Sequence, residues 1–136
     1  MTKDPKDIQR CQDLRHEVFV KGQGVPKAIE VDGRDGQCWH IMAELDGRLL
    51  GVARMRTLGD CVKAERVAVL SDYRHEGIGR MLMEGIHGKT RQLGVHRVVL
   101  SAQVQVVPFY LYLGYRREGE VYSEAGIDHQ RMFLDM

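Results

Sequence analysis

Hydrophobic residues near the start of the chain recur at steps of three and four, the spacing of a helix that buries one face. Asp4 and Pro5 precede this pattern and suit the N-cap and first position of such a helix. Gly22, Gly24 and Pro26 prevent the helix from continuing, so we expect it to end there. The buried stripe that the pattern predicts consists of Ile8, Cys11, Leu14 and Val18.

Alternating apolar positions then replace the helical spacing and predict a strand meander. Before the meander, residues 27–37 are polar and acidic and predict a loop. Asp46 and Gly47 separate two alternating runs, the first at residues 39–45, and predict a hairpin with a type I′ turn. A third antiparallel strand is expected at residues 61–70.

The third strand changes the phase of its alternation. Val62 and Ala64 share one face, whereas Val67 and Val69 fall on the opposite parity. One extra residue near positions 65–66 would return all four side chains to one side, so we expect a β-bulge there. A strand that is buried on both faces is the alternative.

The second half of the chain alternates helices and strands. A helical stripe runs from Ile78 to Leu93 and ends at Gly94, and a short helix containing Pro108 ends at Gly114. The predicted order is therefore α-β-β-β-α-β-α-β-β. We expect an α/β fold of the α+β type in a single domain, residues 1–136, with a mixed, mostly antiparallel, twisted sheet and helices on both faces. The strands of this half are expected at residues 96–102, 115–122 and 129–136.

The charge balance gives no long-range attraction for nucleic acid or for membranes. The chain has 20 Lys and Arg residues against 19 Asp and Glu, for a net charge of +1. The longest nearly apolar run, residues 106–115, is far shorter than the roughly 20 residues needed to span a bilayer. Three cysteines without a CxxC motif predict free thiols in a cytoplasmic protein. No set of His, Cys and Asp residues has metal-ligand spacing, so we expect no metal.

Two glycines, Gly77 and Gly79, open the helix that follows the third strand. The unpaired N–H groups of a first helical turn and the helix dipole together favour an anion, and glycine leaves the backbone open to a phosphate. Arg74 and Arg80 flank the turn and suit the same ligand. The spacing fits neither a P-loop nor a Rossmann fingerprint. A tight turn in which Gly79 packs on a neighbour is the alternative.

Residues 67–83, VAVLSDYRHEGIGRMLM, resemble the acetyl-CoA signature of the GNAT N-acetyltransferase family, with Arg74, Gly77 and Gly79 at the signature positions. Residues 102–115 resemble a later motif of the family, in which a short helix carries a tyrosine, here Tyr110, ahead of a Gly-aromatic pair, here Gly114 and Tyr115. The chain is also similar to a small bacterial-type subgroup of that family. The segments shared with this subgroup are Arg15 to Val20, Glu30 with Asp32, Ala102 with Gln103, and Gly126 to His129.

The resemblance implies acetyl-CoA as co-substrate and direct transfer of its acetyl group to a primary amine, on a small molecule or a peptide, within a ternary complex. The pantetheine arm would lie between two splayed strands, and amides of the glycine turn would hold the pyrophosphate. An amide near Val69 would polarise the thioester carbonyl. Gln103 stands where many members carry Asn. The implied cofactor-binding residues are Val67, Ala68, Val69, Arg74, His75, Glu76, Gly77, Ile78, Gly79, Arg80 and Gln103.

Two residues are candidates for the proton transfers. Tyr110 is the general acid that the resemblance implies, because a phenol can protonate the departing thiolate, and a packed aromatic ring is the alternative. Glu65 is the first candidate for the base that deprotonates the amine. An exposed Glu65 in an ion pair with Arg54 or Arg66 is the alternative.

Other polar side chains are candidates for the acceptor side. His40 and His129 begin strands and could act as bases, although hydrogen-bonded structural histidines are the alternative. Glu30, Asp32 and Asp35 form an acidic segment that would suit a cationic amine. Solvated loop carboxylates are the alternative for these three residues.

The chain departs from the family at its N-terminus. The family usually opens with a strand before the first helix, whereas only three residues precede Asp4, so we expect a short or absent edge strand, which a homodimer could cover. Two other functions stay open. The first part of the chain looks like acyl-homoserine-lactone synthases, structural relatives that transfer longer acyl chains. A CoA-binding sensor without turnover is the other alternative.

Overall fold

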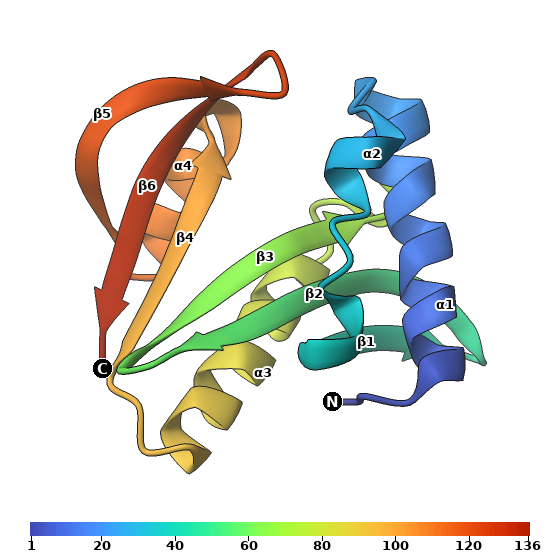
Figure 1. Cartoon of the computed structure of the whole chain (residues 1–136), viewed down its shortest axis with the longest axis horizontal. Coiled ribbons are helices and arrows are strands. Elements are labelled where there is room, and N and C mark those ends of the chain that lie inside the picture. Colours follow the sequence, from blue (N-terminus) through green and yellow to red (C-terminus); the bar gives the residue numbers. More distant parts are fainter.

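A six-stranded sheet runs through the molecule in the order β1-β2-β3-β4-β6-β5 (Figure 1). The structure is a computed structural model that describes residues 1–136. Only β3 and β4 pair in parallel, and every other pair of neighbours is antiparallel. The predicted mixed, mostly antiparallel sheet is therefore confirmed. The strands are β1 (Trp39–Leu45), β2 (Arg48–Leu58), β3 (Cys61–Val69), β4 (Arg97–Gln103), β5 (Arg116–Glu124) and β6 (Ile127–Asp135).

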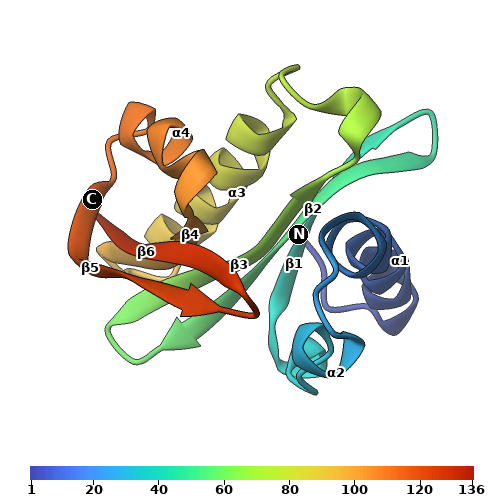
Figure 2. The same ribbon diagram turned by 90° about the horizontal axis from the view of Figure 1, so that it is seen from above.

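Helices cover both faces of this sheet, as expected. Figure 2 shows α1 and α2 on one side of β1–β3 and α3 on the other, with α4 beside β4 and β6. The core between α3 and the sheet contains 17 buried residues, and a smaller cluster of five lies under α1. The helices are α1 (Pro5–Arg15), which continues as a π-helical turn (His16–Lys21), α2 (Lys27–Glu30), α3 (Ile78–Gln92) and α4 (Val107–Tyr112).

The first helix begins and packs as the sequence pattern predicts. The Asp4 side chain accepts a hydrogen bond from the backbone N–H of Lys6, and Pro5 occupies the first turn. All four residues of the predicted stripe are buried. Three of them form the smaller cluster with Val52 of β2 and Ala68 of β3, so α1 is held on the sheet mainly by apolar contacts.

The prediction of a loop over residues 27–37 is wrong in part. The segment contains α2 and a 3₁₀ turn at Asp35–Gln37. The side chains of Glu30 and Asp35 are buried against Arg15 of α1, 15 and 20 residues away in sequence. Tertiary ion pairs thus order a segment whose polar composition is typical of a loop.

Both irregular features predicted in the meander are confirmed. Asp46 and Gly47 adopt φ values of 52° and 77°, as a type I′ turn requires. Arg54 pairs with Glu65 whereas Val52 pairs with Ala68, so two residues of β3 oppose one residue of β2. The bulge returns Val67 and Val69 to the core that contains Val62 and Ala64, and it turns Ala68 towards α1.

The N-terminus adds only a short extension to the edge of the sheet. Thr2 makes one antiparallel bridge to His40, with N–H···O distances of 2.8 and 2.9 Å. This agrees with the expected short edge strand. The cysteines are free thiols, two of them buried, and none of the helices has the length and hydropathy to cross a membrane.

Candidate active site

The two central strands separate after a short stretch of pairing. β3 and β4 are in register only from Val62 opposite Val98 to Ala64 opposite Leu100. Beyond this point β3 continues to Val69 and β4 to Gln103, and Figure 1 shows the two strands diverging. One edge of β3 therefore has unpaired N–H and C=O groups that face an opening between the strands.

The turn that joins β3 to α3 lies at the end of this opening. No side chain caps the N-terminus of α3. The first backbone hydrogen bond of the helix runs from the N–H of Met81 to the carbonyl of Gly77. The amides from His75 to Arg80 donate to no turn, loop or cap carbonyl. This run of free donors, together with the dipole of a 15-residue helix, is suited to an anion.

The two glycines of the turn have different structural roles. Gly77 has a φ of 82°, which a residue with a Cβ atom adopts only under strain, and no atom lies within 4 Å of where its Cβ would be. A Cβ at Gly79 would lie 3.4 Å from the ring of Phe109. The packing of Gly79 on a neighbour is therefore present, while the space beside Gly77 is open to a ligand.

Tyr110 lies in α4 and is buried, with 7% of its surface exposed. Its ring packs edge-on against Phe109 and Tyr115, with centroid distances of 5.0 and 5.6 Å. Burial raises the pKa of Tyr110 above its usual value, so the phenol stays protonated. Its hydroxyl makes no hydrogen bond in the protein. The oxygen is still reached by solvent, because it is not one of the fully buried polar atoms that lack a hydrogen-bond partner. The hydroxyl is therefore available to donate to a ligand.

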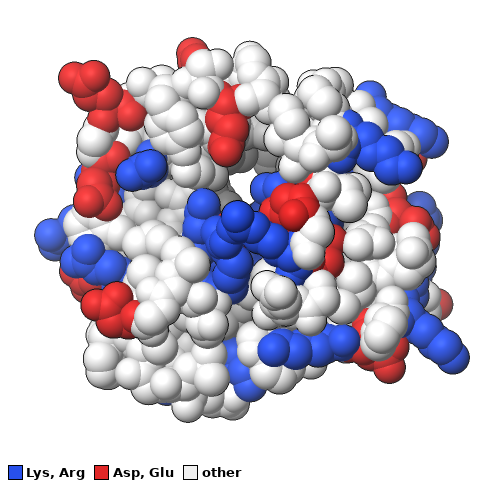
Figure 3. Space-filling view, in the orientation of Figure 1, with Lys and Arg blue, Asp and Glu red and all other residues white.

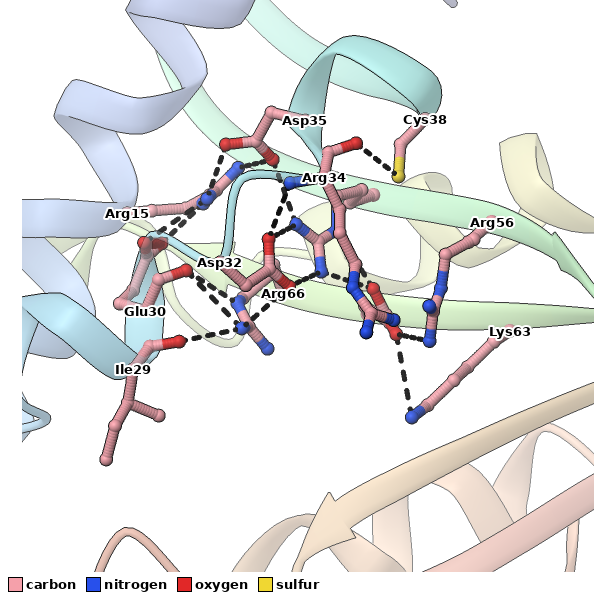
Figure 4. A network of polar contacts seen from close by, with 12 residues as sticks. Arg15, Ile29, Glu30, Asp32, Arg34, Asp35, Cys38, Arg56, Lys63 and Arg66 are labelled. Atoms are coloured by element: carbon pink, nitrogen blue, oxygen red, sulfur yellow. Dashed lines mark hydrogen bonds and ion pairs between the residues drawn. The ribbon is translucent and has the colours of Figure 1, made fainter.

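Glu65 lies on the bulged strand and is held by three cations, of which Figure 4 labels Arg56 and Lys63. It accepts hydrogen bonds from Arg54, at 2.9 Å from Nε, and from Arg56 Nη2 at 3.0 Å, and Lys63 Nζ lies 3.5 Å away. Burial opposes ionisation, but the charges of Arg54, Arg56 and Lys63 prevail and lower the pKa of Glu65. The alternative ion pair with Arg54 is thus present, although the Glu65 side chain is only 7% exposed. Its role as a base stays a prediction.

The acidic segment after α1 is neither solvated nor free. Glu30 and Asp35 are 3% and 4% exposed, and both bind the buried guanidinium of Arg15, with Asp35 Oδ1 2.7 Å from Nη1. Burial would raise the pKa of Asp35, but hydrogen bonds from Arg15 and Gln12 hold it well below its usual value. The alternative of solvated loop carboxylates is therefore wrong for these two residues.

Asp32 completes this network from the partly exposed side. It binds Arg54 at 2.8 and 2.9 Å, and Arg66 lies 3.5 Å away. Arg54, 1% exposed, donates five hydrogen bonds to three carboxylates. All three carboxylates of the acidic segment are therefore bound by arginine side chains.

The two candidate histidines differ in access. His40 is 1% exposed, and its Nε2 lies 2.9 Å from the carbonyl of Asp35, which is the structural arrangement considered as its alternative. His129 Nδ1 lies 2.7 Å from the carbonyl of Ile127 and must carry the proton, because a carbonyl only accepts. The lone pair of neutral His129 is therefore on Nε2. His129 lies on β6, the strand next to β4, and its ring stacks on Tyr122 of β5 with the ring centroids 5.9 Å apart.

Gln103, one of the implied cofactor-binding residues, lies at the open end of β4. Its Nε2 donates to Gln23 Oε1 at 2.8 Å, and its Oε1 accepts from Gln105 at 2.7 Å. Gln23 follows α1 and is 80 residues away in sequence, so this contact spans the opening between the two halves of the molecule. A ligand that binds Gln103 would compete with Gln23.

The sequence interpretation named Arg54 and Arg66 only as ion-pair partners of Glu65, and it missed the other basic side chains of the ion network. Arg15 and Arg54 form the centre of the ion network, and Arg56 and Lys63 face each other across β2 and β3. One signal was available for Arg54, which interrupts the apolar run of β2 between Ala53 and Met55. A charge inside a buried strand indicates a buried partner.

Comparison with known proteins gives consistent results. The sequence model of the acetyltransferase (GNAT) domain matches residues 4–136. The chain is 33% identical over 136 residues to the uncharacterised N-acetyltransferase YjcF of Bacillus subtilis, covering 99% of this chain and 97% of the relative. It is 34% identical to an acyl-CoA N-acyltransferase of Pseudomonas aeruginosa, whose crystal structure superposes with a TM-score of 0.86 over 96% of this chain and 91% of that one.

A more distant solved structure shares the fold alone. It is an aminoglycoside 6′-N-acetyltransferase in complex with coenzyme A, 14% identical, with a TM-score of 0.77. The match covers 97% of this chain and 92% of that protein.

Proposed function

The chain belongs to the GNAT acetyltransferase family, and from this we propose that it transfers the acetyl group of acetyl-CoA to a primary amine by direct attack within a ternary complex. The observation that carries the proposal is the separation of β3 from β4, with the uncapped N-terminus of α3 at the end of the opening. The opening supplies unpaired strand edges, and the helix supplies free amides.

The residues around the opening fit coenzyme A in chemistry and in order. The open edge of β3 at Val67–Val69 can hydrogen-bond the amide groups of pantetheine as an added strand would. The amides from His75 to Arg80 can hold the pyrophosphate, beside the exposed guanidinium groups of Arg74 and Arg80. Gln103 would exchange its bond to Gln23 for one to the ligand.

Acetyl transfer needs a polarised carbonyl and a protonated leaving group. A backbone N–H near Val69 would stabilise the oxygen on which negative charge develops. Nitrogen then forms a bond to the acetyl carbon while the bond from carbon to sulfur breaks. Tyr110 donates its proton to the departing thiolate, because burial keeps this phenol protonated and its hydroxyl has no other partner.

The amine must also lose a proton, and His129 is better suited to accept it than Glu65. Neutral His129 presents an unprotonated Nε2, since Nδ1 donates to Ile127. Glu65 accepts hydrogen bonds from two arginines, and its lowered pKa makes it a weak base. Replacing each residue separately by Gln, with kcat/KM measured against pH, distinguishes the two assignments.

Calorimetry with coenzyme A tests the proposal. We expect binding that weakens as salt rises, since the pyrophosphate is held partly by charge. Absence of heat and of affinity at millimolar coenzyme A would refute the proposal. Acyl-CoA donors of increasing chain length, offered with a panel of amines, separate acetyl transfer from the longer-chain chemistry of acyl-homoserine-lactone synthases. Binding without turnover across the panel would favour a sensor.

A further inference from the structure

Basic side chains gather on the open face of the sheet beside the site. Figure 3 shows Lys and Arg groups at the centre of this face, next to a hollow between the two halves of the molecule. Arg56 of β2 pairs directly with Lys63 of β3, so their side chains lie on the same face as the neighbouring pair of Arg54 and Glu65. We call Arg56, Lys63 and Arg66 the basic patch; their side chains are 22%, 34% and 26% exposed.

The carboxylates near the basic patch do not neutralise it. The connected ion network contains five cations and four carboxylates, which leaves one positive charge in excess. The carboxylates bind mainly the two buried arginines, Arg15 and Arg54, whereas Arg56 and Lys63 share the single carboxylate of Glu65. The excess charge therefore lies on the exposed side, where a ligand can reach it.

The basic patch also has unused hydrogen-bond donors. Arg56 Nε is the one buried side-chain nitrogen or oxygen of the molecule without a hydrogen-bond partner. Arg66, on the bulge at a φ of 53°, makes only long contacts of 3.3–3.4 Å to the carbonyls of Ile29 and Glu30 and lies 3.5 Å from Asp32. Unpaired donors on arginine are costly when buried and suit an oxyanion.

The position of the basic patch relates it to the acceptor. Lys63 lies in the part of β3 that pairs with β4, one residue before the last pair at Ala64. Arg66 lies in the unpaired part and immediately precedes Val67. The basic patch thus lies beside the segment that would hold the thioester, on the face opposite α3. A substrate that reaches the thioester from this face passes the three cations.

We propose that the basic patch binds a carboxylate of the acceptor, so that the preferred substrates are small amines that also carry a carboxylate. This rests on the proposed function. The carboxylate attracts the substrate in its resting, zwitterionic form. The same cations disfavour the ammonium form of the bound amine and so promote the neutral nucleophile that attack requires. A purely cationic amine has no carboxylate for the basic patch to bind and is repelled by its positive charge.

Matched pairs of amines test this inference. β-Alanine, 4-aminobutyrate, glutamate, lysine and an acidic tripeptide are each compared with the corresponding carboxamide, which keeps the skeleton and removes the charge. We expect kcat/KM to favour the carboxylates by about tenfold or more, the effect of a charged hydrogen bond, and the preference to decrease as salt rises. A preference confined to the tripeptide would identify a peptide acceptor and would overturn the assignment to small amines.

Variants tie the preference to the basic patch. In Lys63→Met and Arg56→Met we expect the ratio of kcat/KM for the carboxylate to kcat/KM for the carboxamide to fall about tenfold, because KM for the carboxylate rises. Lys63→Arg should retain this ratio. Lys6→Met removes an exposed cation of α1 and serves as the matched control. A ratio of kcat/KM for the carboxylate to kcat/KM for the carboxamide of one or below in the wild type overturns the inference and leaves the proposed function intact. The same holds if neither variant changes this ratio.

Calorimetry separates failure of the inference from failure of the function. With the protein saturated by coenzyme A, which cannot react, we expect heat of binding from 4-aminobutyrate and none from its carboxamide. Binding of coenzyme A without binding or turnover of any carboxylated amine overturns the inference alone. If coenzyme A itself does not bind, the proposed function fails. Titration of 4-aminobutyrate into the protein alone then decides whether the basic patch binds a carboxylate.

Discussion

Replacing Arg54 by Met should destabilise the protein more than any other single loss of charge. Arg54 is 1% exposed and donates five hydrogen bonds to Asp32, Asp35 and Glu65. Without it, the buried carboxylates of Asp35 and Glu65 lose a counter-ion, and β2, β3 and the segment after α1 lose their common anchor. Removing one partner of a buried ion pair costs about 3–5 kcal/mol.

This loss is a large fraction of the about 5–15 kcal/mol by which such domains are stable. Arg54→Lys keeps the charge but replaces a planar fork by one ammonium, so we expect an intermediate loss, and this variant stays measurable if the Met variant does not fold. Arg97→Met is the control. Arg97 binds Asp135 with a contact of 2.6 Å, but the two side chains are 46% and 59% exposed, so its loss should hardly matter.

The effect of Arg54→Met should depend on pH with a defined sign. The pKa values of Asp32, Asp35 and Glu65 are lowered in the folded protein by their arginine partners, against the effect of burial. Their contribution to stability is therefore present above about pH 4, the range of unfolded carboxylates, and is lost as pH falls below it. In the variant these carboxylates are buried without a partner and bind protons readily. The difference in the free energy of unfolding between wild type and variant should shrink from pH 7 to pH 3.

Urea unfolding followed by circular dichroism at both pH values measures this difference. Two results would refute the reasoning. One is a loss for Arg54→Met as small as that for Arg97→Met at pH 7, which would mean that the network adds nothing. The other is a difference that does not change with pH, which would mean that the loss comes from packing and not from charge.

Three further changes have defined outcomes. Tyr110→Phe should lower kcat about 100-fold or more without weakening the binding of coenzyme A in calorimetry. Tyr112, a neighbouring tyrosine that is 77% exposed, provides the control, and Tyr112→Phe should retain kcat. Equal effects of the two variants on kcat would contradict the role of Tyr110 as general acid. Gly77→Ala and Gly119→Ala each place a Cβ at positive φ and should each cost about 1–2 kcal/mol in urea unfolding. Only Gly77→Ala should weaken coenzyme A binding, and a matching loss in both would contradict the anion site. Burial lowers the pKa of His87, so the folded state keeps it neutral and stability falls as pH drops below about 6.5. His87→Phe should reduce the slope of unfolding free energy between pH 7 and pH 5, and an unchanged slope would contradict this.

The features that the sequence predicted correctly are those set by neighbouring residues. The stripe on α1, the turn at Asp46 and Gly47, and the bulge after Glu65 each follow from spacing within about ten residues. The separation of β3 from β4 has no such local signal. It was expected only from the resemblance of the glycine turn to a known family.

The features that were missed depend on contacts between distant residues. The segment 27–37 is ordered by Arg15, and Gln103 is held by a glutamine 80 residues away. Composition shows that Glu30 and Asp35 are acidic but does not show that one guanidinium pairs with both. The interpretation of the segment as an acceptor-side surface treated each charge as independent, and this assumption fails where charges are buried together.

The same distinction explains how a chain with a net charge of +1 presents a basic surface beside its site. Net charge counts residues, whereas the field at a surface depends on which charges are paired and where. Arg15 and Arg54 lie inside the molecule and pair with the carboxylates of the acidic segment. Arg56 and Lys63 are left with one carboxylate between them. The buried ion pairs thus determine the sign of the exposed face, and with it the charge of the acceptor that this face can attract.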